Sequence, residues 1–138
     1  MTVASSAYWD DLVADLADPE FLRAYITESL RVDTIDRLVN DLDHAREKLG
    51  LSKADLARAI SAEPAVIRRL LSSGQRNPTI GTLVEVAAAL NLKVVLVPMA
   101  ESERAEYAEP LRAGSVKEPA KLARRIEDRR RSRHSVTA

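Results

Sequence analysis

Cysteine is absent from the 138-residue sequence, and glycine is scarce. Without a thiol there is no disulfide, no cysteine nucleophile and no cysteine-containing zinc site. Only four glycines are present, and none belongs to a phosphate-binding loop that follows a strand pattern. No nucleophilic residue lies beside a plausible base. The sequence therefore predicts that the protein is not an enzyme and needs no cofactor.

Long apolar runs are also missing. No run approaches the roughly 18 residues that a membrane span needs, and residues 1–6 lack the basic and apolar regions of a secretion signal. These absences predict a cytoplasmic protein with no membrane partner. Aromatic residues make up only 4% of the chain and apolar residues 46%, so the core must consist mainly of Leu, Val, Ile and Ala, which favours an all-α fold.

Few side chains could bind a metal ion. His44 and His134 stand apart from each other, with no second histidine at ligand spacing. Asp10, Asp11 and Asp15 could pair their carboxylates, but they also fit the exposed face of a helix whose other side is apolar. We therefore predict no metal site.

The formal net charge of zero hides an uneven distribution of charge. Residues 1–50 carry 11 acidic and 5 basic side chains, residues 51–100 carry 3 and 6, and residues 101–138 carry 7 and 10. This asymmetry indicates a polyanionic partner for the later part and suits a basic partner for the first. Solvated surface is the alternative for both parts. The sequence leaves three roles open for the arginines near the end of the chain: a solvated tail, a non-specific DNA arm or a membrane-surface element. These arginines are Arg124, Arg125, Arg129, Arg130, Arg131 and Arg133.

Apolar residues repeat at helical spacing through the first 50 residues and predict three amphipathic helices. The first carries Tyr8, Leu12, Val13 and Leu16. Asp18-Pro19-Glu20 predicts the beginning of the second, with a capping residue, a first-turn proline and an acid. Asp33 or Thr34 can cap the third, which should end at Gly50.

Shorter helices with tight connections follow from residue 51. Ser52-Lys53-Ala54-Asp55 resembles a capping box in which Asp replaces the usual Glu. Glu63-Pro64 predicts the beginning of the next helix, because proline is tolerated in a first turn. Thr79 should cap the last helix of the group, and Asn91 should end it.

Residues 93–97 are rich in β-branched side chains and too short for a helix, which predicts a strand closed by Pro98. A single strand leaves backbone groups unpaired, and the same strand of a second copy would pair them. We therefore expect a homodimer. Its contact residues would be Val94, Val95, Leu96 and Val97. Residues 101–118 should form a linker, and residues 119–131 at most a helix that forms on contact.

Several stretches between Leu49 and Val97 share one known pattern: residues 51–58 (LSKADLAR), 66–70 (VIRRL), 74–79 (GQRNPT), and Leu83 with 87–90 (AAAL). This segment resembles the Xre/Cro/CI helix-turn-helix family, and the whole chain is similar to antitoxins of the HigA and HipB type. The resemblance implies a lambda-repressor-like bundle over 34–98 with a helical extension over 1–33. The charged sequence after Met99, which lacks a regular apolar spacing, predicts a mobile charged linker and basic tail over 99–138.

The resemblance also implies that the helix over 63–71 enters the major groove of DNA. Its apolar positions belong to the core, which leaves Glu63, Pro64, Ala65, Arg68 and Arg69 facing outward. The family commonly has Gln, Ser or Thr where Pro64 and Ala65 stand, so base reading would fall to Arg68 and Arg69. A solvated basic face is the alternative. The expected phosphate contacts are Ser52, Lys53, Arg76 and Asn77.

By this resemblance the protein is an antitoxin that binds double-stranded operator DNA as a dimer, represses its own transcription and neutralises a small basic toxin. Expected toxin contacts, for which core packing is the alternative, are Tyr8, Trp9, Leu12, Phe21 and Tyr25. A stand-alone Xre-type regulator without a toxin is the alternative function. A general nucleoid or single-strand binder that uses the arginine tail is the third.

Overall fold

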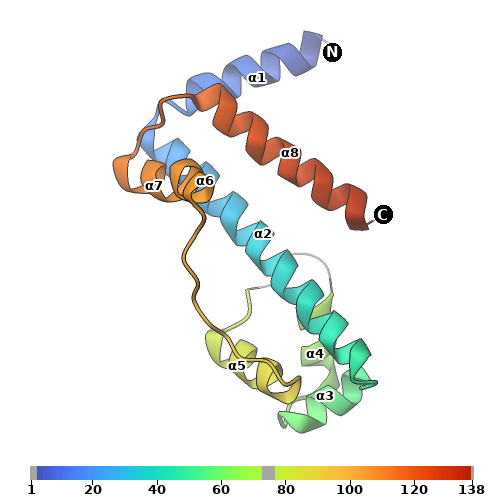
Figure 1. Ribbon diagram of the computed structural model, residues 1–138. Coiled ribbons are helices and arrows are strands. Elements are labelled where there is room, and N and C mark those ends of the chain that lie inside the picture. Colours follow the sequence, from blue (N-terminus) through green and yellow to red (C-terminus); the bar gives the residue numbers. More distant parts are fainter. Residues whose placement is uncertain (1–2, 73–76, 138) are drawn as a thin grey trace. The chain divides into compact units, whose positions relative to one another are not determined.

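Helices dominate the structure, a computed structural model that describes residues 3–72 and 77–137 (Figure 1). None of these residues forms a β-strand. By contacts the chain divides into a terminal unit, residues 1–29 with 98–138, and a central unit, residues 30–97. The helices are α1 (Val3–Asp15), α2 (Pro19–Lys48), α3 (Lys53–Ala59), α4 (Pro64–Leu71), α5 (Ile80–Ala89), α6 (Glu101–Glu103), the π-helical turn η1 (Arg104–Ala108), α7 (Glu109–Ala113) and α8 (Pro119–Thr137).

The long helix α2 belongs to both units, and here the sequence prediction of two separate helices is wrong. No break occurs at Asp33 or Thr34, because residues 20–49 contain neither glycine nor proline. Asp and Thr inside a helix cost only about 0.7 kcal/mol relative to Ala. The predicted ends are confirmed: Asp18 accepts a hydrogen bond from the Glu20 amide at 3.2 Å, and Gly50 turns the chain with a φ of 70°.

In the terminal unit, apolar side chains from α1, α2, η1 and α8 are buried. α1 contacts α8 directly. All five aromatic residues of the chain lie in this unit, so the central unit has none. The buried apolar side chains are Leu12, Leu16, Leu22, Ile26, Tyr107, Leu122, Ala123 and Ile126.

A buried carboxylate joins η1 to α8. Glu106 is only 7% exposed, and its two oxygens accept hydrogen bonds from Arg125 and Arg129. The Arg129 guanidinium also lies 4.9 Å from the centre of the Tyr107 ring. Burial alone would raise the pKa of Glu106, but the two arginine hydrogen bonds outweigh burial and lower it.

Helices occupy residues 101–113 and 119–137, where the sequence predicted a linker and a helix that forms only on contact. That prediction is wrong because the stabilising partners are distant in sequence. Arg125 and Arg129 pair with Glu106, and Arg130 donates to Ser29 at 3.2 Å. The turn η1 also interrupts the 3.6-residue spacing by which a helix is identified in a sequence.

The central unit is built around one apolar cluster. Its members come from the end of α2 and from α3, α4 and α5, and Leu56, Ile67 and Val86 are fully buried. Truncating Leu56 or Ile67 to alanine would cost about 2–5 kcal/mol, because a cavity would remain. The remaining buried members are Leu42, Ala57, Leu70, Leu71, Ala87 and Leu90.

The predicted strand over 93–97 does not form in the described chain. A strand requires hydrogen bonds to a neighbouring strand, and no other described segment is a strand with which it could pair. The segment instead follows α5 without regular structure, and its apolar side chains are exposed, with Leu96 99% exposed.

Candidate functional site

The helix α3 begins with the reciprocal cap that the sequence predicts. The Asp55 amide donates to Ser52 Oγ, and the Ser52 amide donates to Asp55 Oδ2, both at 3.0 Å. The Asp55 carboxylate also pairs with Arg58. The backbone hydrogen bond from Ser52, followed by its side-chain hydrogen bond, holds the pKa of Asp55 below its ordinary value. The Ser52 amide, which we expected to contact phosphate, therefore already donates its hydrogen bond to Asp55 within the cap.

A tight turn connects α3 to α4. Ser61 has a φ of 54°, in the left-handed region, and the Ala62 amide donates to the Ala57 carbonyl oxygen at 2.8 Å. Pro64 occupies the first turn of α4, as predicted. The turn brings α4 back against α3, and the two helices are in contact.

The helix α4 has one buried face and one exposed face. Ile67, Leu70 and Leu71 are buried in the apolar cluster. Arg68 and Arg69 are exposed, and neither guanidinium has a hydrogen-bond or ion-pair partner among the residues that the structure describes. Glu63 and Ala65 are also exposed, and Pro64 is half-buried. The outer face of α4 thus presents two arginine forks, each able to bind a guanine edge or a phosphate.

The other expected phosphate contacts have different positions. Lys53, the first residue of α3, is exposed. Asn77 is exposed just before α5, whose cap is Thr79 Oγ1 accepting from the Thr82 amide at 3.1 Å. Arg76 lies outside the described residues. The structure thus leaves the side chains of Lys53 and Asn77 accessible to a ligand.

One residue that fixes this region was missed by the sequence analysis. Arg46, near the end of α2, donates from Nη1 to the Leu51 carbonyl oxygen at 2.7 Å and from Nε to Asp43 at 2.9 Å. Its side chain is only 14% exposed. The signal available in the sequence was an acid three residues before an arginine on one helix face. That spacing could not reveal the bond to Leu51.

The expected toxin contacts lie in the terminal unit, where most are engaged. Leu12 is buried, and the hydroxyls of Tyr8 and Tyr25 both donate to Glu127, at 3.4 and 2.9 Å. Burial first, and then the Glu127 hydrogen bond, raises the pKa of Tyr25. Phe21 stacks on Tyr25, and Trp9 packs edge-on against Tyr8. Tyr8 is 51% exposed, so it is the member most available to another protein.

The arginine run of α8 is partly used inside the terminal unit. Arg125 and Arg129 pair with Glu106, Arg130 with Glu127, and Arg131 with Asp128. Arg124 is exposed, and the side chain of Arg133 lies outside the described part of the chain. These ion pairs reduce the positive charge that α8 can offer to a polyanion.

Among the residues that the structure describes, two kinds of feature are absent. No group of three or more His, Cys, Asp or Glu side chains is placed to hold a metal ion. None of the helices is long and apolar enough to cross a membrane.

A family model described as helix-turn-helix matches residues 42–97, from the last two turns of α2 through α5 to the end of the central unit. The match covers 56 of the 138 residues and supports a helix-turn-helix domain in this segment. Its paired helices are α3 and α4, and α4 is the helix with the exposed arginines. The match supports a DNA-binding transcriptional regulator. The terminal unit lies outside the match, and no curated protein or solved structure matches the chain.

Proposed function

We propose that the protein is a transcriptional regulator that reads double-stranded DNA with the outer face of α4. The observation that carries this proposal is the pair Arg68 and Arg69, exposed and unpaired within the described chain on a helix whose other face is buried. An arginine fork on guanine O6 and N7 discriminates against a wrong base by about 1–3 kcal/mol. Pro64 and Ala65 can donate no side-chain hydrogen bond, so the two arginines carry the base reading.

Phosphate contacts would set the position of the domain on DNA. Lys53 and Asn77 have exposed side chains and lie on either side of α4 in sequence. Arg76 lies outside the described residues, and we include it because it directly precedes Asn77 in the sequence. Such contacts are independent of base sequence. Each phosphate contact by a basic side chain that is removed should lower the slope of log affinity against log salt by about one.

We propose a homodimer, because the helix-turn-helix domain leaves an apolar segment uncovered. The exposed side chains are Val94, Val95, Leu96 and Val97, and Ile80 and Val84 of α5 are exposed as well. A second copy would remove these side chains from water and place two α4 helices on half-sites about 34 Å apart. In sedimentation analysis, Leu96→Asp should shift the protein towards monomer, while Thr34→Asp, at an exposed position of α2, should not. Equal dimer fractions would contradict this contact.

DNA binding is tested with the fragment upstream of the protein's own reading frame. In fluorescence anisotropy the full chain should bind this fragment at least roughly tenfold more tightly than a scrambled fragment. Lys53→Gln should lower the slope of log affinity against log salt by about one, whereas Lys121→Gln in the terminal unit should leave it unchanged. Equal affinity for both fragments would contradict regulation of its own gene.

An antitoxin is the more specific candidate, and we propose it from the charge of the first 50 residues together with the resemblance. Eleven acids against five bases suit a basic partner, and the terminal unit is larger than DNA reading needs. A neighbouring reading frame should then encode a small basic protein that is toxic alone and harmless with this chain. Toxicity that persists on co-expression would leave the stand-alone regulator as the function.

A further inference from the structure

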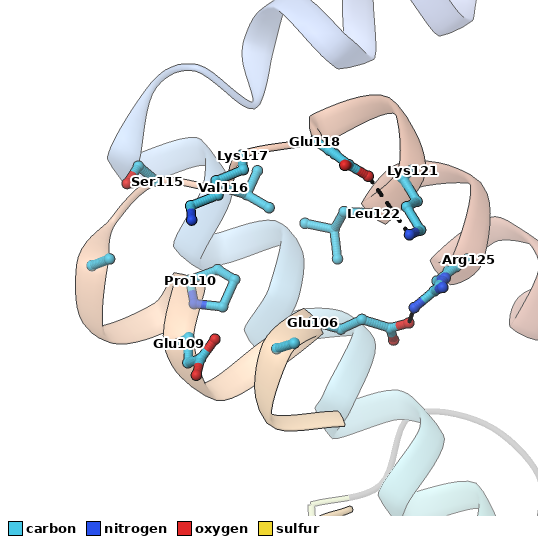
Figure 2. Close-up of a pocket in the computed structure, with 12 residues that line it drawn as sticks. Glu106, Glu109, Pro110, Ser115, Val116, Lys117, Glu118, Lys121, Leu122 and Arg125 are labelled. Carbon is cyan, nitrogen blue, oxygen red and sulfur yellow. Dashed lines mark hydrogen bonds and ion pairs between the residues drawn. The ribbon is translucent and has the colours of Figure 1, made fainter. Parts of the chain in front are cut away.

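The terminal unit contains a pocket of about 500 Å³ between α7 and α8 that DNA reading does not use. Figure 2 shows Pro110 of α7 and Leu122 of α8 on facing sides of this pocket, with Val116 between them. Ala105 and Ala113 extend the apolar lining. A pocket of this size with an apolar floor and a few charged groups at its edge is typical of a site for a small organic molecule.

The walls of the pocket are held in place by contacts outside it. Arg23 of α2 donates from Nε to the Leu111 carbonyl oxygen at 2.9 Å and from Nη2 to that of Arg112 at 3.3 Å. These bonds satisfy carbonyls at the end of α7, which helix geometry leaves without partners. Gly114 follows with a φ of 73°, and a side chain there would approach Arg23 Nη2 to 2.8 Å. The pocket is therefore a built feature of the fold.

The charges around the pocket favour an anion. The charged side chains that line the pocket balance, with three acids and three bases. Arg129, which lies outside the lining, adds one positive charge by pairing with Glu106, which Arg125 also binds. Glu118 is offset by Lys121 at 3.6 Å (Figure 2). Lys117 has no hydrogen-bond or ion-pair partner among the described residues, and Glu109 is the one acid that opposes it.

We propose that this pocket binds a small amphipathic carboxylate, with the apolar part against Pro110, Val116 and Leu122 and the carboxylate near Lys117. The apolar part supplies most of the affinity, since its burial removes apolar surface from water. The carboxylate supplies the preference for an anion over a neutral or cationic ligand of equal length. This proposal is independent of DNA binding, because every residue that it uses lies in the terminal unit.

The test is an NMR titration of the full chain with octanoate, 1-octanol and octylammonium, three probes with the same apolar chain and different charge. Octanoate should shift the amide resonances of residues 105–125 in a saturable way and bind about threefold or more tightly than the other two. Equal affinity for all three probes would overturn the anion preference, and shifts confined to other residues would overturn the site.

Two pairs of variants locate the ligand within the pocket. Ala113→Trp fills the pocket from an exposed position and should weaken octanoate binding roughly tenfold, whereas Ala120→Trp, exposed on α8 outside the lining, should not. Lys117→Gln should weaken octanoate binding about threefold and leave 1-octanol binding unchanged. The control Arg124→Gln should change neither affinity. Unchanged octanoate binding by Ala113→Trp would contradict the proposal. Far-ultraviolet circular dichroism confirms that each variant is folded, because two of the variants add a second tryptophan to Trp9.

Discussion

Arg46 and Leu51 connect the end of α2 to the segment that leads into α3, because Arg46 Nη1 donates to the Leu51 carbonyl oxygen at 2.7 Å. The same guanidinium is held by Asp43, at 2.9 Å from both Nε and Nη2. Between the two residues the chain turns at Gly50. The direction in which the chain approaches α3 is thus set by a hydrogen bond to a charged donor, in addition to apolar packing.

Replacing Arg46 by methionine should therefore destabilise the central unit. Methionine keeps much of the apolar stem, but the Leu51 carbonyl and Asp43 lose a charged partner, which costs about 1–3 kcal/mol. Urea unfolding followed by far-ultraviolet circular dichroism measures this loss. Arg37→Met, at an exposed position of α2, is the control and should change little. An equally small change in both variants would show that the Arg46 hydrogen bonds contribute nothing.

Ser61→Gly should stabilise the protein. Ser61 has a φ of 54°, which is unfavourable for any residue with a Cβ and costs roughly 1 kcal/mol that glycine avoids. Ala59→Gly, two residues earlier in α3, should instead destabilise by about 1 kcal/mol. The two glycine variants should thus shift the unfolding midpoint in opposite directions. A shift in the same direction would mean that the turn after α3 is not strained.

The cap of α3 should make stability depend on acid pH. The pKa of Asp55 is lower in the folded chain than its ordinary value of 3.8, through the Ser52 backbone and side-chain hydrogen bonds and the charge of Arg58. Its contribution to stability is therefore present above that value and is lost as the pH falls through the folded pKa. Between about pH 7 and about pH 3 the thermal midpoint should fall further for wild type than for Asp55→Asn. Parallel curves would contradict a role for the Asp55 charge.

Replacing the buried carboxylate of the terminal unit should destabilise the protein more than replacing an exposed carboxylate. Glu106→Gln leaves Arg125 and Arg129 without their shared anion and should destabilise this unit by roughly 1–3 kcal/mol, because both arginines are partly exposed. Trp9 fluorescence reports the loss, since the only tryptophan lies in this unit. Glu101→Gln, exposed in α6, is the matched control. Equal unfolding midpoints for the two variants would mean that the arginine pair does not stabilise α8.

Local signals predicted the ends of the short helices, because each end depends on residues only a few positions apart. Ser52 with Asp55, Pro64, Thr79 and Asn91 have the predicted roles, and Asn91 has a φ of 64°. The exposure of Arg68 and Arg69 also follows from helical spacing. Their contact with DNA remains a proposal.

Features that depend on distant partners were not predictable. Arg125 and Arg129 lie 19 and 23 residues from Glu106, so their charge suggested a solvated tail. Tyr25 lies 102 residues from Glu127, whose carboxylate accepts hydrogen bonds from both Tyr25 and Tyr8. The strand over 93–97 was predicted from β-branched composition, but composition does not supply the neighbouring strand that pairing requires.

The most direct test of the account is the ratio of affinities for the upstream fragment and a scrambled fragment, measured for Arg68→Ala/Arg69→Ala at fixed salt. If α4 reads bases, this ratio should fall by at least roughly tenfold, since each bidentate contact contributes about 1–3 kcal/mol of discrimination. The charge-matched control Arg124→Ala/Arg131→Ala, with both substitutions on α8, should keep the wild-type ratio. A double variant of α4 with an unchanged ratio would contradict base reading by this helix.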